Sequence, residues 1–471
     1  MREKDIKIEQ NMNVVDKILN TVKTGNLRLN APELASLVFL KFTSDNAEML
    51  CVEIDSFHSY NALVSLLSSG AISVREFIDS CAKIIDQTGM NRYGVGPYLA
   101  QFLMPLATNR AMIEVLNLVA KMDLTDDRAV GVAAQIMSII ISKLRVTARD
   151  EYNTSSDSIA QLMAGIAVSE NCKSVYDGAC GYGLGLMHAH ILAPNATVEG
   201  QDININCVMV CAIMQWLAFN STFTIELGDT LRSPLSAKRK QKYDAVIMAP
   251  PFGLRIDDDV ILSATEETVK YGDLLQRKSD WFFVQHAMAV LSGKGTGVLH
   301  LPMGALFQGG KVQEIREVFV RNRHIHAVIS LPEGAVPGTA ILSTLIVVKE
   351  DTNDSGVLFV NGAAPQISNY FFRAKRGVTT ISAEGISELT SIVRERKEIE
   401  GVSSIATLEE IAGKKYLLTP SAYTDASNEE KTHTEPVEDI CTAISDLEQD
   451  LILNARELAE AVLNFNSIIN R

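Results

Sequence analysis

Residues 175–185 read Val-Tyr-Asp-Gly-Ala-Cys-Gly-Tyr-Gly-Leu-Gly, and this stretch decides the fold. A short apolar strand pattern ends at Asp177, and a turn rich in glycine follows it. Glycine permits positive φ angles and lets the backbone approach a ligand closely. The pattern therefore predicts a strand, a ligand-binding turn and a helix. A tight turn without a ligand is the alternative, because glycine spacing of this kind is not specific on its own.

Short apolar segments of the same character continue as far as residue 348, and helical segments separate them. The expected strands cover residues 174–177, 197–200, 224–227, 243–248, 297–301, 326–331 and 344–348. Strands that alternate with helices at this spacing predict an α/β fold with a mostly parallel, doubly wound sheet. Ligands bind at the carboxyl ends of the strands in such sheets.

Acidic residues stand at the next two expected strand ends. Asp202 ends the second strand, where an acid commonly accepts hydrogen bonds from ribose hydroxyls. Asp229 follows the third strand and is a candidate partner for an adenine amino group. Each acid taken alone is more often a helix cap or a turn residue. Acids at three successive strand ends, Asp177 included, favour a nucleotide-like ligand.

The fourth strand ends in the turn Ala249-Pro250-Pro251-Phe252. The two prolines remove two backbone donors and stiffen the turn. Phe252 offers a ring on which a base can stack. Taken alone, the motif is better explained as a strand terminator followed by a core phenylalanine. The polar segment 253–278 that follows is either a lid over a target base or an ordinary surface insertion, with equal support.

The regions on either side of the sheet are expected to be helical. Residues 1–150 carry apolar side chains at helical spacing, as in the stretch 32–42, and residues 437–468 do the same after a polar linker. We therefore expect a helical domain at 1–150, the sheet domain at 151–425 and a helical tail at 426–471.

The chain has 471 residues and a net charge of −14, from 43 Lys and Arg against 57 Asp and Glu. This balance argues against a generic basic nucleic-acid coat but permits a local DNA-binding cleft. Half of the acidic excess lies in the expected tail. No apolar run is long enough to span a membrane. Seven cysteines without a Cys-x-x-Cys pair indicate a reduced, cytoplasmic protein, and no metal site is predicted.

Together these motifs resemble the modification subunit of type I restriction-modification systems, a family of adenine-N6 DNA methyltransferases. The resemblance covers most of the chain. It implies a Rossmann-like sheet that binds S-adenosylmethionine, with a helical domain before it and a helical tail after it. The cofactor contacts that it implies come from Glu151, Tyr152, Thr154, Ser155, Asp177, Gly178, Ala179, Cys180, Gly181, Gly183, Asp202, Ile203, Asp229, Thr230 and Leu231.

The resemblance assigns the reaction to Ala249, Pro250, Pro251 and Phe252, but the family has Asn or Asp where this chain has Ala249. In the family, that side chain and the first proline's carbonyl accept hydrogen bonds from the amino group of an adenine flipped out of duplex DNA. Alanine has no acceptor, and loss of an oriented polar group at a reacting centre commonly costs ~10²-fold or more in rate. We expect an impaired catalyst, and the alanine is either engineered or a natural loss.

The resemblance also implies partners. A separate specificity subunit reads the DNA sequence in this family, and the tail at 437–468 is its expected contact, although packing within the chain explains the tail equally well. A second copy of the chain and a restriction nuclease subunit are further implied partners. Two alternatives stay open: a non-catalytic module that binds cofactor or DNA in a larger assembly, and a nicotinamide oxidoreductase. Cytosine-N4 transfer also fits the motif, because both targets are exocyclic amines.

Overall fold

A computed structural model describes residues 3–424, apart from gaps at 107, 126–130, 148–155, 219, 221, 266–267, 276, 337–340, 351–355 and 374–378. Residues 1–424 form one compact unit. The expected tail and both expected domain boundaries lie outside the described residues, so they stay predictions. Within the described part of the chain, no helix has the length and apolar character needed to cross a membrane.

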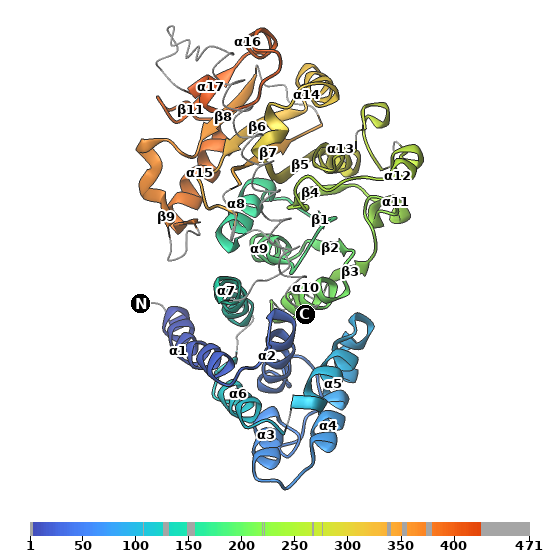
Figure 1. Ribbon diagram of the computed structural model, residues 1–471, viewed down its shortest axis with the longest axis vertical. Coiled ribbons are helices and arrows are strands. Elements are labelled where there is room, and N and C mark those ends of the chain that lie inside the picture. The colour runs from blue at the N-terminus through green and yellow to red at the C-terminus, as the bar shows by residue number, and fades with distance from the viewer. Residues whose placement is uncertain are drawn as a thin grey trace, which may run out of the picture. The chain divides into compact units, whose positions relative to one another are not determined.

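The N-terminal part of the described chain is helical, as predicted (Figure 1). Ser73 and Glu76 begin one of these helices with a reciprocal capping box, and Gly89 ends it at a φ of 70°. The helices are α1 (Glu3–Thr24), α2 (Ala31–Asp45), α3 (Tyr60–Ser68), α4 (Val74–Thr88), α5 (Val95–Leu106), α6 (Arg110–Ala120) and α7 (Val132–Thr147).

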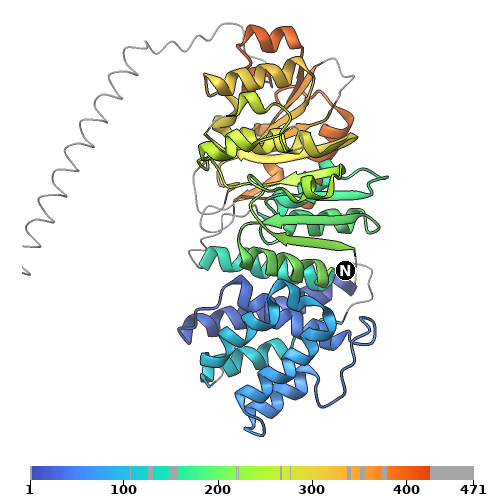
Figure 2. The ribbon, with the colours of Figure 1, turned by 90° about the vertical axis from the view of Figure 1, so that its right-hand side faces the viewer.

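A large mixed sheet follows, with its strands stacked one above the other in Figure 2. Its strands, in the order in which they pair, are β11 (Ser403–Ala406), β8 (Val357–Asn361), β6 (Ile325–Ser330), β7 (Ser343–Val348), β5 (Leu291–Pro302), β4 (Tyr243–Met248), β1 (Ser174–Asp177), β2 (Thr197–Asp202) and β3 (Phe223–Leu227). β1 is parallel to both β2 and β4, so the strand order reverses beside β1. The predicted α/β fold is confirmed.

β7 departs from the expected parallel arrangement. It pairs antiparallel with both β5 and β6, and Ile346 lies opposite Leu299 on one side and Val328 on the other. A parallel return needs a long crossover, usually a helix. The described residues of the connection 331–342 form no helix, so the chain turns back instead. β8, β11 and the separate pair β9 (Phe371–Arg373) and β10 (Thr379–Ile381) were not expected from the sequence.

Helices cover both faces of the sheet. Alternate residues of β1 show this arrangement, because Val175 joins the core that includes α8, α9 and α10, whereas Tyr176 joins the core that includes α13 and α14. The helices of this region are α8 (Asp157–Ala167), α9 (Leu184–Leu192), α10 (Ile205–Leu217), α11 (Leu235–Arg239), α12 (Asp258–Ser263), α13 (Asp280–Val290), α14 (Lys311–Arg321), α15 (Ala383–Glu395), α16 (Leu408–Gly413) and α17 (Ser421–Thr424).

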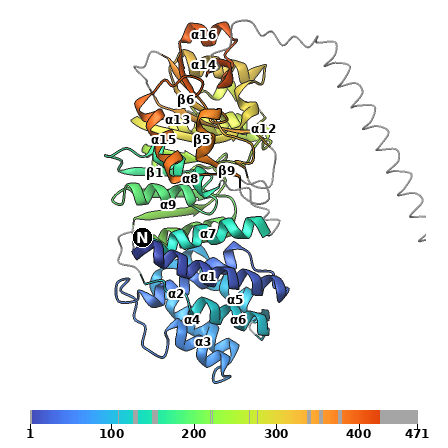
Figure 3. The same cartoon turned by 90° about the vertical axis from the view of Figure 1, so that its left-hand side faces the viewer.

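The N-terminal helices pack directly against α10. Trp216 at the end of α10 donates a hydrogen bond from Nε1 to Thr43 Oγ1 at 3.1 Å, and its ring meets the Phe39 ring edge to face, 6.1 Å between centroids. Figure 3 shows α7 between the other N-terminal helices and the sheet region. One continuous apolar core joins the helical region to this face of the sheet.

Candidate functional site

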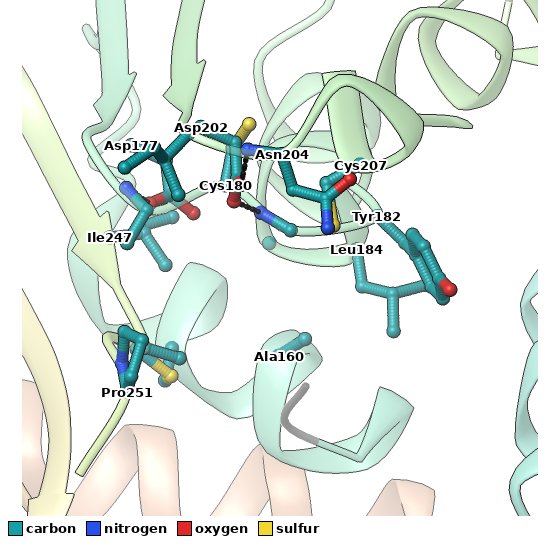
Figure 4. A pocket seen from close by; sticks show the side chains of 16 residues that line it. Ala160, Asp177, Cys180, Tyr182, Leu184, Asp202, Asn204, Cys207, Ile247 and Pro251 are labelled. Atoms are coloured by element: carbon teal, nitrogen blue, oxygen red, sulfur yellow. Dashed lines mark hydrogen bonds between the residues drawn. The ribbon is translucent and has the colours of Figure 1, made fainter. Parts of the chain in front are cut away.

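A cavity of about 300 Å³ lies at the carboxyl ends of β1, β2 and β4, where the strand order reverses. This is the position at which doubly wound sheets bind ligands. Figure 4 shows Asp177, Cys180 and Asp202 on one side, with Ala160 and Pro251 across from them. The lining residues are Ala160, Met163, Asp177, Ala179, Cys180, Gly181, Tyr182, Leu184, Gly185, Asp202, Ile203, Asn204, Cys207, Ile247, Ala249 and Pro251.

The glycine-rich turn between β1 and α9 forms one wall of the cavity. Gly181 and Gly183 have φ angles of 51° and 80°, in the left-handed region that favours glycine. Gly183 also leaves no room for a side chain, because an added Cβ would lie 2.6 Å from Cys211 Sγ on α10. The turn therefore requires glycine for both its conformation and its packing, and the structure has the predicted order of strand, turn and helix.

Asp177 is buried at the end of β1, with 4% of its surface exposed. Its Oδ1 accepts a hydrogen bond from the Ala179 backbone N–H at 2.9 Å. Burial raises the pKa of this carboxyl group to about 8, and the nearby charge of Asp202 adds to the shift. An adjacent positive charge would favour the ionised form. The wall is therefore suited to a positively charged ligand group.

Asp202 ends β2 and faces the same turn. Its Oδ2 accepts from the Gly181 backbone N–H at 2.9 Å, and its Oδ1 accepts from the Asn204 N–H at 2.8 Å (Figure 4). A carboxylate has about four acceptor positions, so Asp202 can also bind a hydroxyl group in the cavity. Beside it, the Ile203 side chain is 71% exposed and adds an apolar surface.

The residues after β3 support the walls. The Thr230 hydroxyl is buried and donates to the Gly178 carbonyl at 2.5 Å, which ties this loop to the glycine-rich turn. Asp229 accepts from the Leu231 backbone N–H at 2.9 Å and lies 3.4 Å from Arg232 Nε. Among the described residues, Asp229, Thr230 and Leu231 are not in the cavity lining, and neither are Gly178 and Gly183. Their cofactor contacts stay a prediction.

The turn after β4 reaches the same cavity. Ala249 and Pro251 line it, while Pro250 is buried and Phe252 is half-buried. The Phe252 ring meets the buried His300 ring edge to face, with 5.3 Å between centroids and an interplanar angle of 85°. The sequence motifs at the ends of β1, β2 and β4 therefore come together in one site.

The start of α13 holds this turn in position, a role that sequence reasoning missed. Asp280 Oδ1 accepts from the Gly253 backbone N–H at 2.9 Å, and Ser279 Oγ donates to the Pro251 carbonyl at 3.4 Å. Asp280 is 5% exposed, and burial raises the pKa of its carboxyl group. The residues lie 27 and 28 positions along the chain from their partners, so no local motif points to them.

Half of the lining was not predicted. Helices α8 and α10 bring in apolar residues that belong to no motif, and others stand within or beside the predicted stretches. The missed residues are Ala160, Met163, Tyr182, Leu184, Gly185, Asn204, Cys207 and Ile247. Conversely, the predicted residues Glu151, Tyr152, Thr154 and Ser155 lie outside the described residues, and their contacts stay a prediction.

The comparison with protein families identifies the chain. The model of the N-6 DNA Methylase family matches residues 138–432, a range that contains every strand of the sheet and the cavity. The chain belongs to this family. The family predicted from the sequence motifs is therefore confirmed, and membership of the N-6 DNA methylase family favours a DNA methylase over a nicotinamide oxidoreductase.

Relatives of the family carry more specific names. The chain is 26% identical over 341 residues to the type I restriction enzyme MpnII methylase subunit of Mycoplasma pneumoniae, covering 68% of this chain and 61% of that protein. It is 26% identical over 291 residues to the MjaVIII methylase subunit of Methanocaldococcus jannaschii, covering 58% and 49%. The chain thus spans about half of the length of one of these relatives and about three-fifths of the other.

The fold is similar to that of a solved structure. A crystal structure of the type I restriction-modification system methyltransferase subunit from Streptococcus thermophilus superimposes with a TM-score of 0.74 at 19% identity. The match covers 88% of this chain and 100% of that one. The helical region and the sheet of this member of the N-6 DNA Methylase family therefore have the fold of that solved structure.

Proposed function

We propose that this chain is the modification subunit of a type I restriction-modification system, and that its cavity binds S-adenosylmethionine next to a target adenine of duplex DNA. One observation carries the proposal: the glycine-rich turn and the turn containing Pro251 line the same cavity. A methyl donor held by the first turn would lie beside a base held by the second, which is the geometry that a transfer requires.

The cavity fits this cofactor in its chemistry. The buried carboxyl group of Asp177 suits a positively charged group, and the remaining acceptor positions of Asp202 suit ribose hydroxyls. Ile203 offers an apolar face to an adenine ring. A volume of about 300 Å³ lies at the lower end of the range for small-molecule sites. When bound, S-adenosylmethionine supplies an electrophilic methyl group.

The turn after β4 would hold the target base. The half-buried Phe252 ring can stack on it, and the Pro250 carbonyl can accept a hydrogen bond from its amino group. Ala249 provides no second acceptor. The amino nitrogen is then less well oriented, and we expect methyl transfer ~10²-fold or more below that of a chain with asparagine here.

The test compares the chain with Ala249→Asn and with Ala249→Leu, which adds a side chain of similar size and no acceptor. Each is assayed for transfer of labelled methyl groups to DNA from S-adenosylmethionine, in the complex co-purified with its specificity subunit. We expect the asparagine variant alone to gain activity. No gain, with S-adenosylmethionine bound by all three chains, would refute the enzymatic role of this chain.

Ala249 also favours a second candidate, a non-catalytic module that binds cofactor or DNA within a restriction or phage-defence assembly. That function predicts normal binding of S-adenosylmethionine and DNA, assembly with partners, and no methyl transfer even with asparagine at position 249. The same assay therefore separates the two functions.

The proposal extends to the organisation of the protein. A helical domain at 1–150 and a methyltransferase domain at 151–425 would be followed by a tail at 426–471 that binds the specificity subunit. A second copy and a restriction nuclease subunit would complete the assembly. The six cysteines of the described part are all free thiols, in keeping with a cytoplasmic protein.

A further inference from the structure

A short antiparallel ladder follows the Pro-Pro-Phe turn. Arg255 and Lys278 pair across it, flanked by backbone hydrogen bonds from Ile256 N–H to the Arg277 carbonyl and from Ser279 N–H to the Leu254 carbonyl, both 2.8 Å. This pattern makes Arg255 and Lys278 a non-hydrogen-bonded pair, the kind whose Cα atoms stand closest, at about 4.5 Å. The side chains of Arg255 and Lys278 therefore start next to each other on the same face of the ladder.

The ladder has a buried face and an exposed face. Ile256 is 2% exposed and packs in a small core with Val260, Val269, Leu275 and Phe282. Successive residues of an extended chain point to opposite faces, so Arg255 points away from this core. Lys278, directly opposite, shares that outward face. Both side chains are exposed.

The charged side chains near Arg255 and Lys278 form ion pairs with one another. Arg232 pairs with Asp257 at 3.0 Å and also with Asp259. Arg277 pairs with Asp258 at 2.7 Å. The three consecutive acids after Ile256 are thus each in an ion pair.

Arg255 and Lys278, in contrast, have no ion pair within 4 Å to any carboxylate that the structure describes. Burial raises the pKa of the Asp280 carboxyl group, and the charge of Lys278, which acts on it at longer range, offsets only part of that rise. Like charges directly opposite one another are unfavourable in a ladder. An anion bound between the two side chains would relieve this repulsion.

The ladder is fixed to the turn that meets the cavity. Ser279, one residue beyond Lys278, donates its hydroxyl to the Pro251 carbonyl, and Asp280 accepts from the Gly253 N–H. The two cations therefore have a set position relative to the turn on which a target base would stack.

We propose that Arg255 and Lys278 bind backbone phosphates of duplex DNA that flank the target base. This inference rests on the proposed function and names the surface by which the segment 253–278 contacts its substrate. Phosphate contacts position a protein on DNA without reading its sequence. The pair would thus set the depth at which the duplex approaches the cavity, while a partner subunit reads the sequence.

The test measures the affinity of the full-length chain for a short duplex with one unpaired adenine, over a series of salt concentrations. Each phosphate contact contributes about 0.9 to the slope of log affinity against log salt. We expect the double variant Arg255→Ala/Lys278→Ala to bind more weakly and to lose about 1.8 from that slope. Its affinity for S-adenosylmethionine should not change.

The matched control is Lys173→Ala/Lys294→Ala. It also removes two exposed positive charges, but Lys173 directly precedes β1 and Lys294 lies near the start of β5, at the ends of the strands opposite to the cavity. An equal slope change in both double variants, or no change in either, would refute the inference while leaving the proposed function intact. If the unaltered chain binds S-adenosylmethionine but no DNA at low salt, the DNA-modifying function itself fails.

Discussion

The buried carboxyl group of Asp177 makes the stability of this protein depend on pH in a definite direction. Its pKa is about 8 in the folded chain, against an ordinary value of 3.8. Between these two pH values the folded state holds a proton that the unfolded chain has released. Unfolding is then favoured as the pH rises, with a slope approaching 1.4 kcal/mol per pH unit, by linkage at about 25 °C.

Asp177→Asn removes this titration and keeps the geometry, because an amide oxygen can still accept from the Ala179 N–H. Well below pH 3.8 the carboxyl group is protonated in both states of the unaltered chain, and the two proteins should differ little. At pH 7 the accumulated penalty is on the order of 4 kcal/mol, so the variant should be the more stable by that order.

Urea unfolding of both proteins at a series of pH values between about 5 and 8, without cofactor, measures this difference. The expected result is a gap that widens steadily with pH. Gly185→Ala serves as a control, because it adds a methyl group close to Asp177 and changes no charge. Parallel stability curves for the unaltered chain and Asp177→Asn would refute the claim that this carboxyl group is held neutral by burial.

Three further predictions concern packing and positioning. Gly183→Ala should lower the free energy of unfolding by about 2–5 kcal/mol, from left-handed strain and overpacking, and a loss below about 1 kcal/mol in urea would contradict this. In an Ala249→Asn background, Asp280→Ala should lower the methyl-transfer kcat about tenfold or more without weakening S-adenosylmethionine binding, and an equal loss of cofactor affinity would argue against a positioning role. Trp216→Phe should cost about 1 kcal/mol by removing the hydrogen bond to Thr43, and unchanged thermal unfolding would show that this bond contributes nothing.

The parts of the fold that the sequence predicted are those with local signals. A strand, a glycine-rich turn and a helix each have a recognisable residue pattern within about a dozen residues, as around Asp177 and Gly183. The direction of β7 has no such pattern, because an apolar run such as 343–348 is equally compatible with a parallel and an antiparallel strand. The edge strand β11 is short, and its pairing with β8 rather than its composition defines it.

The candidate site divides in the same way. Asp202 was predicted because strand ends in a doubly wound sheet meet at one edge. Cys207 and Ala160 were not, because an apolar residue on a helix looks identical whether it lines a cavity or fills a core. Thr230 has the position of a ligand-binding residue, yet its hydroxyl bonds to the glycine-rich turn. Only the tertiary contacts distinguish such support from direct lining.

Helix α10 contacts the cavity with its first turn and the N-terminal helices with its last turn. Cys207 on its first turn lines the cavity. Trp216 on its last turn packs against the N-terminal helices and donates a hydrogen bond to Thr43. A fragment that begins after residue 155 would lack the N-terminal helices that pack against α10. It would therefore expose apolar surface of a helix whose residues 207–215 are all buried. Because one apolar core runs from the N-terminal helices through α10 to the sheet, we expect the helical region and the region around the cavity to unfold together rather than as separate domains.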